Sequence, residues 1–153
     1  MSAIKVAGPG GRPAWRRWLA SRRFVIADRS MEPTLRPGDR VLVDRGAYRS
    51  HPPSVGDVVA AADPADPARW LVKRIAAVGP TDMAIPGSVA GDPGERPRAG
   101  VPAGTVFLVS EALDLGRDSR RFGPLPLAAL RGRVWYRYAP SDRTGPIPPA
   151  VSP

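Results

Sequence analysis

The stretch Ser30–Asp44, which reads SMEPTLRPGDRVLVD, sets two predicted strands on either side of a rigid turn. A β-type run, Arg23–Asp28, ends just before it, and the dipeptide Pro37-Gly38 makes a turn into the second strand. Pro33 restricts the residue before it to extended geometry. We therefore expect Ser30 to be exposed and rigid, as a nucleophile must be. A serine that only caps the turn by bonding backbone groups is the alternative.

Short β-type runs separated by proline and glycine turns continue on both sides of this stretch. A glycine- and proline-rich surface loop is expected at Gly87–Gly104, and a short helix at Pro126–Leu130. The pattern predicts a mostly β fold, with one domain over residues 23–139. The predicted strands are Arg23–Asp28, Arg40–Asp44, Asp57–Ala61, Arg69–Val78, Asp82–Ile85, Thr105–Ser110 and Arg133–Tyr138.

The two ends of the chain differ in composition from this domain. Residues 1–22 are expected to be a partly disordered N-terminal arm, and residues 140–153 a disordered, proline-rich tail. Within the arm, Trp15–Phe24 (WRRWLASRRF) combines tryptophan with arginine. It predicts either a short helix that packs its tryptophans on the domain or a segment that lies on an anionic membrane surface.

Hydropathy indicates where the protein resides. No apolar run approaches the roughly 18 residues of a membrane-spanning helix, and the N-terminus lacks the apolar stretch of a secretory signal. We therefore expect a cytoplasmic protein, with peripheral membrane contact as the alternative.

Composition excludes several kinds of site. The 153 residues contain no cysteine and one histidine, His51. The lack of cysteine excludes disulfides, a cysteine nucleophile, iron–sulfur clusters and cysteine-based zinc sites. A single histidine excludes a multi-histidine metal centre within one chain. A Ser-His-Asp triad would have to use His51, which falls in an expected exposed loop.

The net charge of +9 comes from 23 lysines and arginines against 14 aspartates and glutamates. Such a charge is typical of proteins that bind nucleic acids. The arginines are nevertheless spread along the chain, and no helix-turn-helix, zinc finger or aromatic-rich RNA-binding motif is present. We therefore expect no specific nucleic-acid partner.

Only two of the 23 basic residues are lysines, Lys5 and Lys73. In strand alternation Lys73 shares a face with Leu71, Ile75 and Ala77, and is the lone charge on an apolar stripe. Burial lowers the pKa of a lysine from about 10.4, and a neutral lysine can act as a general base, whereas arginine cannot. A lysine that extends to solvent or pairs with a carboxylate is the alternative.

These segments resemble, in order, those of the type I signal peptidase family of Ser/Lys-dyad proteases. SMEPTL followed by GDRVLVD is similar to the family's nucleophile region, and the blocks together span roughly residues 24–138. The later blocks are Val55–Val59 (VGDVV), Val72–Val78 (VKRIAAV), Val101–Val109 (VPAGTVFLV), and Asp118–Pro126 (DSRRFGPLP) with Leu130–Val134 (LRGRV).

The resemblance implies a signal-peptidase-like β fold and a serine endopeptidase, with Ser30 as nucleophile and Lys73 as general base. The Ser30 backbone N–H would be one oxyanion donor. Met31 matches a methionine that packs beside the serine, and Asp118 and Arg120 match a buried pair that supports the site. The supporting residues are thus Met31, Asp118, Ser119 and Arg120.

The implied reaction is acyl transfer. Neutral Lys73 takes the proton from Ser30 Oγ, which attacks the scissile carbonyl, and preorganised N–H groups hold the oxyanion. Water then hydrolyses the acyl-enzyme. No metal and no cofactor is required.

The chain departs from the family's pattern at three places. Asp28 stands where the family usually has glycine or serine, and its carboxylate would repel an oxyanion if it faced the site. Ser110-Glu111-Ala112 replaces the usual Gly-Asp-Asn that opens the closing box. Gly116 replaces a serine that often helps to orient the lysine. A catalytically impaired binding module of the same fold is therefore an alternative.

The short length and the ending RGRVWYRYAP resemble the compact branch of nickel-type superoxide dismutase maturation proteases. That branch implies a protein substrate with an N-terminal leader peptide, here the nickel superoxide dismutase precursor. Two alternatives stay open. One is processing of exported proteins, as by signal peptidase I, without a membrane anchor. The other is a self-cleaving repressor, although 22 residues before the core are too few for its DNA-binding domain.

Overall fold

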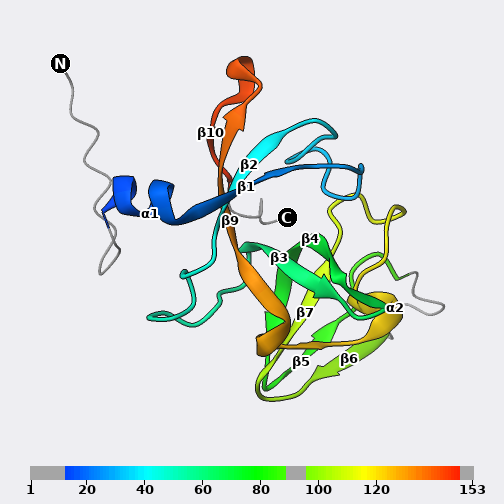
Figure 1. The fold of residues 1–153 in the computed structure, drawn as a ribbon. Coiled ribbons are helices and arrows are strands. Elements are labelled where there is room, and N and C mark those ends of the chain that lie inside the picture. Colours follow the sequence, from blue (N-terminus) through cyan, green and yellow to red (C-terminus); the bar gives the residue numbers. More distant parts are fainter. Residues whose placement is uncertain (1–12, 89–95, 149–153) are drawn as a thin grey trace.

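The computed structural model describes residues 13–88 and 96–148. An antiparallel sheet has the order β1-β2-β9-β3-β4-β7-β8, with β10 paired to β9, and β5 and β6 form a separate two-stranded sheet (Figure 1). The mostly β fold predicted from the sequence is confirmed. The strands are β1 (Ser21–Val25), β2 (Arg40–Asp44), β3 (Val58–Asp63), β4 (Asp66–Val78), β5 (Thr81–Ala84), β6 (Arg98–Val101), β7 (Thr105–Val109), β8 (Leu125–Pro126), β9 (Leu130–Ala139) and β10 (Gly145–Pro146).

Within the described residues, four short helical segments accompany the strands. Two are α-helices, α1 (Ala14–Ala20) and α2 (Ser119–Phe122), and two are 3-10 helices, η1 (Leu127–Ala129) and η2 (Ser141–Arg143). In the part of the chain that the structure describes, no helix is long and apolar enough to cross a bilayer.

Strand β9 joins the two halves of the sheet. Its first residues pair with β3, and its later residues pair with β2, so it runs from one group of strands to the other (Figure 1). Gly132 lies where β9 passes β2, and a Cβ at this position would come within 2.6 Å of the Asp44 carbonyl oxygen. A glycine is therefore required for the close approach of the two backbones.

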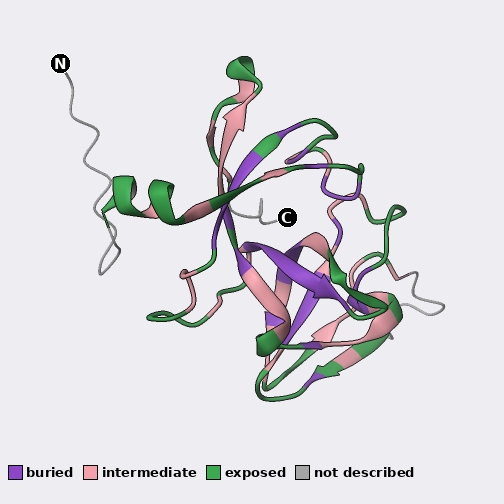
Figure 2. Cartoon of the chain, viewed as in Figure 1, coloured by how far each residue is buried: buried purple, intermediate pink, exposed green. Residues whose placement is uncertain are grey.

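Strand β3 is buried on both faces and separates two apolar clusters (Figure 2). Val58 and Ala60 belong to a cluster with Met31, and Val59 and Ala61 belong to the other. The alternation follows from the two-residue period of a strand. The first cluster is Ile26, Met31, Leu35, Val41, Val43, Val58, Ala60 and Val134; the second is Val59, Ala61, Ile75, Val106, Leu108 and Leu125.

The C-terminal segment corrects the expectation of a disordered tail from residue 140. Residues 141–146 form η2 and β10, and the Ile147 N–H donates to the Trp135 carbonyl at 3.0 Å. Ile147 also packs against the first apolar cluster. A single isoleucine and the free edge of β9 thus order a segment whose composition indicates disorder. Residues 149–153 lie outside the described residues.

Two further expectations change. The loop expected at Gly87–Gly104 contains β6, which pairs with β5 because the turn brings a second short strand beside it; residues 89–95 of that loop lie outside the described residues. In the N-terminal arm, α1 forms but does not pack its tryptophans on the domain. Trp15 is 61% exposed and Trp18 45%, and arginine side chains stack on both rings.

Candidate active site

The structure brings Ser30 and Lys73 into contact. Lys73 Nζ lies 2.7 Å from Ser30 Oγ, although the two residues are 43 positions apart in the chain. Ser30 follows β1, and Lys73 lies in the middle of β4. Both residues are only 2% exposed, so the expectation that Ser30 is exposed is wrong: the side chain packs against Lys73. The two side chains therefore form a buried hydroxyl–amine pair within hydrogen-bonding distance.

The turn that carries Ser30 is fixed by backbone hydrogen bonds and by packing. The Leu35 N–H donates to the Met31 carbonyl at 2.8 Å, and Met31 and Leu35 are both buried in the first apolar cluster. The Ala112 N–H donates to the Ser30 carbonyl at 3.0 Å. Met31 thus fixes the turn through the first apolar cluster, and the loop after β7 fixes it through the Ala112 N–H.

The surroundings of Lys73 favour a neutral amine. Val59 stands opposite it in the β3–β4 register, and Ile75 on the same strand is buried. Burial lowers the pKa of Lys73 from its ordinary value, and the negative charges of Asp28 and Asp118 offset only part of this effect. A larger fraction of neutral lysine at a given pH is the consequence, and a neutral amine can accept the proton of a hydroxyl.

Asp118, Ser119 and Arg120 hold the loop that follows β7. Asp118 is buried and forms an ion pair with Arg120 at 2.8 Å, while Arg120 itself is only partly buried. The Ser110 N–H also donates to Asp118 Oδ2 at 2.8 Å. Burial acts to raise the pKa of Asp118, but hydrogen bonds from Arg120 and Ser110 outweigh it and hold this pKa below its ordinary value. The Ser119 hydroxyl accepts the Leu108 N–H at 2.9 Å.

Asp28 changes the expected role of the Ser30 backbone. The Ser30 N–H, which the resemblance implies to be an oxyanion donor, donates to Asp28 Oδ1 at 2.9 Å in this structure. This hydrogen bond has a local cause, because an aspartate two residues earlier readily closes such a turn. Burial acts to raise the pKa of Asp28, but hydrogen bonds from Ser30 and the charge of Lys73 outweigh it and lower this pKa. Asp28 therefore stays an anion beside the nucleophile.

Sequence reasoning missed two ion pairs that brace the site. Arg74, directly after Lys73, hydrogen-bonds Glu111 through Nε at 2.6 Å, and Glu111 also accepts the Thr34 N–H at 3.3 Å. Arg117 pairs with the buried Asp63 at 2.7 Å. Glu111 belongs to the departure Ser110-Glu111-Ala112 from the family's closing box. The basic residue Arg74, next to Lys73, was the sequence signal that such a carboxylate could have a partner at the site.

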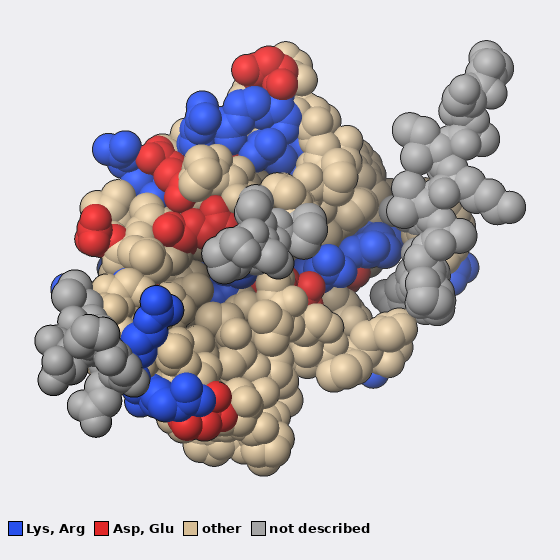
Figure 3. Space-filling model, turned by 180° about the vertical axis from the view of Figure 1, so that it is seen from behind, with Lys and Arg blue, Asp and Glu red and all other residues tan. Residues whose placement is uncertain are grey.

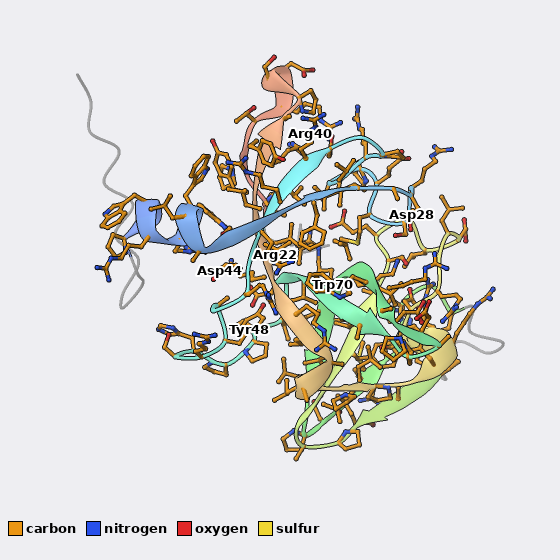
Figure 4. The ribbon with its side chains drawn as sticks, viewed as in Figure 1. Arg22, Asp28, Arg40, Asp44, Tyr48 and Trp70 are labelled. Carbon is orange, nitrogen blue, oxygen red and sulfur yellow. The ribbon has the colours of Figure 1, made fainter. Side chains whose placement is uncertain are left out.

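An apolar cavity of about 110 Å³ opens beside Ser30. Phe24 and Trp70 stand at its wall with ring centroids 4.8 Å apart. Figure 4 shows Asp28 at the end of the segment that follows β1 and Trp70 on the strand below it. The lining residues are Phe24, Val25, Ile26, Ala27, Asp28, Ser30, Met31, Ala60, Trp70, Leu71 and Val72.

Three further features bear on other kinds of site. His51 is exposed and lies 3.0 Å from Ser50 Oγ. Residues 13–88 and 96–148 hold no cluster of three or more metal-ligating side chains. On the face seen in Figure 3, lysine and arginine form separate groups interspersed with aspartate and glutamate. On this face the basic side chains do not form one continuous patch of the kind that binds nucleic acids.

Comparison with known proteins identifies relatives. The family model for signal peptidase, peptidase S26, matches residues 14–89. The mitochondrial ATP-independent inner membrane protease subunit 1b of Arabidopsis thaliana is 37% identical over 122 residues, which cover 78% of this chain and 71% of that protein. A probable signal peptidase I-1 of Synechocystis is 28% identical over 151 residues, covering 85% and 76%. The mitochondrial inner membrane protease subunit 1 of Xenopus tropicalis is 32% identical over 125 residues, covering 80% and 72%.

These relatives correct the expected location. The Arabidopsis and Xenopus proteins are named as inner membrane proteases. The names point to membrane association, and the expectation of a cytoplasmic protein is wrong. That expectation rested on missing apolar segments, and a protein can reach a membrane by other means.

Proposed function

Because the chain belongs to the signal peptidase, peptidase S26, family and is a peptidase, we propose that it is a serine endopeptidase that removes N-terminal leader peptides with a Ser30–Lys73 dyad. The 2.7 Å separation of Ser30 Oγ and Lys73 Nζ carries the proposal. The burial that lowers the pKa of Lys73 supports it, because only the neutral amine can take the serine proton.

In the proposed reaction the Lys73 amine removes the proton from Ser30 Oγ, and the oxygen attacks the scissile carbonyl. The ammonium so formed then protonates the leaving amine, and a water molecule hydrolyses the acyl-enzyme. Asp118 and Arg120 act indirectly, because they fix the loop whose Ala112 N–H holds the Ser30 carbonyl. No metal or cofactor takes part in these steps.

Asp28 must release the Ser30 N–H before that group can stabilise an oxyanion. Its carboxylate accepts that N–H in this structure, and a carboxylate beside a developing oxyanion would repel it. We infer that substrate binding in the cavity moves the Asp28 side chain away. The resting enzyme is thus less active than its dyad geometry alone would allow.

The cavity beside Ser30 limits what the leader peptide can present. Its small volume and apolar lining, including Ala60 and Val72, suit a short apolar side chain near the cleaved bond. The rings of Phe24 and Trp70 form part of its wall. A large or charged residue at that substrate position is therefore expected to slow cleavage.

We also propose that α1 contacts the surface of an anionic membrane. It stands out beside β1 in Figure 1, and Trp15, Trp18 and Leu19 are exposed on it. Arg16 and Arg23 lie over the two indole rings and supply the complementary charge. In sedimentation with vesicles that contain anionic lipid, wild type should bind more than a Trp15→Ala, Trp18→Ala variant. Leu127→Ala, an exposed leucine elsewhere, is the matched control, and equal binding by all three proteins would contradict the proposal.

The decisive experiment incubates the protein with a leader-bearing substrate protein and follows cleavage by mass spectrometry. Wild type should cleave, while Ser30→Ala and Lys73→Met should not. A nickel superoxide dismutase precursor tests the narrower role in maturation of that enzyme, which the sequence suggested. None of the relatives described above is named for this role. Exported precursors test the alternative substrate class. A non-catalytic binding module is the remaining alternative, and a serine-directed acyl probe that labels wild type but not Ser30→Ala would dismiss it.

A further inference from the structure

We propose that Ser110 is a positioning residue for Lys73, and this inference rests on the proposed dyad. The Ser110 side chain is completely buried, and its Oγ has no hydrogen-bond partner in the structure. It is the one buried side-chain polar atom in that condition among the described residues. Buried hydroxyls are almost always hydrogen-bonded, so a hydroxyl kept unpaired beside a reacting centre calls for a functional explanation.

The position of Gly116 shows where the Ser110 hydroxyl lies. A Cβ built on Gly116 would be 3.3 Å from Ser110 Oγ and 3.2 Å from Lys73 Nζ. It would also be 2.9 Å from the Cβ of Ser30. The hydroxyl, the amine and the nucleophile therefore surround one point. The missing side chain at residue 116 leaves the hydroxyl and the amine free to approach each other.

The backbone of Ser110 is held firmly enough to aim its side chain. Ser110 comes directly after β7, and its N–H donates to the buried Asp118. Asp118 is fixed in turn by two side-chain nitrogens of Arg120. The Asp118–Arg120 ion pair therefore fixes the Ser110 backbone, in addition to the loop whose Ala112 N–H holds the Ser30 carbonyl.

Residues 110 and 116 are two of the departures from the family pattern described above, and the structure places them side by side. The two differences compensate each other. The hydroxyl comes from the other side of the same point, and a glycine at residue 116 makes room for it. A side chain at residue 116 would also be strained, because its φ angle is +82°.

The chemistry of the amine explains what the hydroxyl does. Neutral Lys73 offers two N–H donors and one lone pair, and a bond from one N–H to Ser110 Oγ turns the lone pair toward Ser30. After proton transfer the ammonium donates to the same oxygen, and hydrogen bonds from charged donors are the stronger ones. This contact is absent from the resting structure, and the proposal requires a rotation of either side chain into the space beside Gly116.

The test compares Ser110→Ala with wild type in the cleavage assay. We expect kcat to fall about 10- to 100-fold with KM little changed, because the amine loses its orientation. We also expect the acidic limb of the pH profile to move to lower pH, since the ammonium loses an acceptor. The charged groups that face Lys73, namely Asp28, Asp118 and Arg120, are intact in this variant. The melting temperature should change little, because the deleted hydroxyl has no hydrogen-bond partner in the resting structure.

Ser21→Ala is the matched control. The Ser21 hydroxyl donates to the Arg17 carbonyl and accepts the Trp135 indole N–H, so this variant should melt at a lower temperature and keep the pH limb in place. Ser110→Cys, which has a similar shape and a weaker acceptor, should shift the limb in the same direction as Ser110→Ala. An unchanged kcat and pH limb in Ser110→Ala would overturn the inference. Full activity of Lys73→Met would instead overturn the proposed function.

Discussion

Replacing Asp28 by serine should make the enzyme faster. In the resting structure the Asp28 carboxylate accepts the Ser30 N–H at 2.9 Å. A hydrogen bond to a charged group contributes about 1.5–3 kcal/mol, and that contribution is lost whenever the N–H turns to an oxyanion. Since about 1.4 kcal/mol corresponds to a factor of ten in rate, we expect kcat/KM to rise about 10- to 100-fold in Asp28→Ser.

The pH dependence provides a second measurement on the same variant. The negative charge of Asp28 raises the pKa of Lys73, in opposition to burial. Removing that charge lowers the pKa of Lys73 further, so more neutral amine is present at low pH. The acidic limb of kcat/KM, which reports the free enzyme, should therefore move to lower pH.

The assay is continuous cleavage of a fluorogenic leader peptide across pH 5–10, on variants whose melting temperatures are also measured. Asp28→Asn is the matched control, because it keeps the shape and an acceptor for the Ser30 N–H but not the charge. It should be intermediate in rate and show the same shift of the limb. A folded Asp28→Ser variant at or below the wild-type rate would refute the reasoning and make Asp28 a structural cap of the turn.

Three other changes have expected outcomes. Lys73→Met should abolish cleavage yet raise stability at pH 7 by about 1–3 kcal/mol in urea unfolding, because a buried amine is replaced by an apolar chain. Because the pKa of Lys73 is lower in the folded than in the unfolded chain, the unfolded chain binds more protons, and the free energy of unfolding of wild type rises with pH up to about 10.5. This rise with pH should be smaller in Lys73→Met. An equal rise in both proteins would argue against a buried neutral lysine. Gly116→Ala should inactivate the enzyme in the cleavage assay, because the new Cβ meets that of the nucleophile at 2.9 Å; retained activity would show that the site can move. Glu111→Ala should lower the free energy of unfolding by about 3 kcal/mol, because it leaves Arg74 charged and buried. Asp82→Ala, which breaks an exposed ion pair, should change it by less than about 0.5 kcal/mol. Equal losses in the two variants would contradict this account.

Much of the fold follows from local signals. Strand Arg40–Asp44 was predicted with both of its ends correct, because Pro37-Gly38 marks the turn before it and its apolar residues are continuous. Strand β6 was missed, because Arg98–Val101 is short and its order depends on pairing with β5 and on the packing of Val101 with Ala77 and Phe107. Residues 141–146 were missed for the same reason, since their order depends on β9 and not on their own composition.

The sequence by itself determined which residues could do the chemistry. Ser30 stands out by its place between a strand and a proline turn, and Lys73 by being a lone lysine on an apolar stripe in an arginine-rich chain. Such signals are local, because strand period and turn chemistry act over a few residues.

Only the tertiary structure decided how these residues meet. The pairing of β9 with both β2 and β3 brings the turn after β1 onto the middle of β4, and so places two atoms 2.7 Å apart that lie 43 residues apart in the chain. It also places the Asp28 carboxylate on the Ser30 N–H and the Ser110 hydroxyl beside Gly116. These contacts depend on long-range register and on burial, and burial, not the identity of the residue, is what lowers the pKa of Lys73.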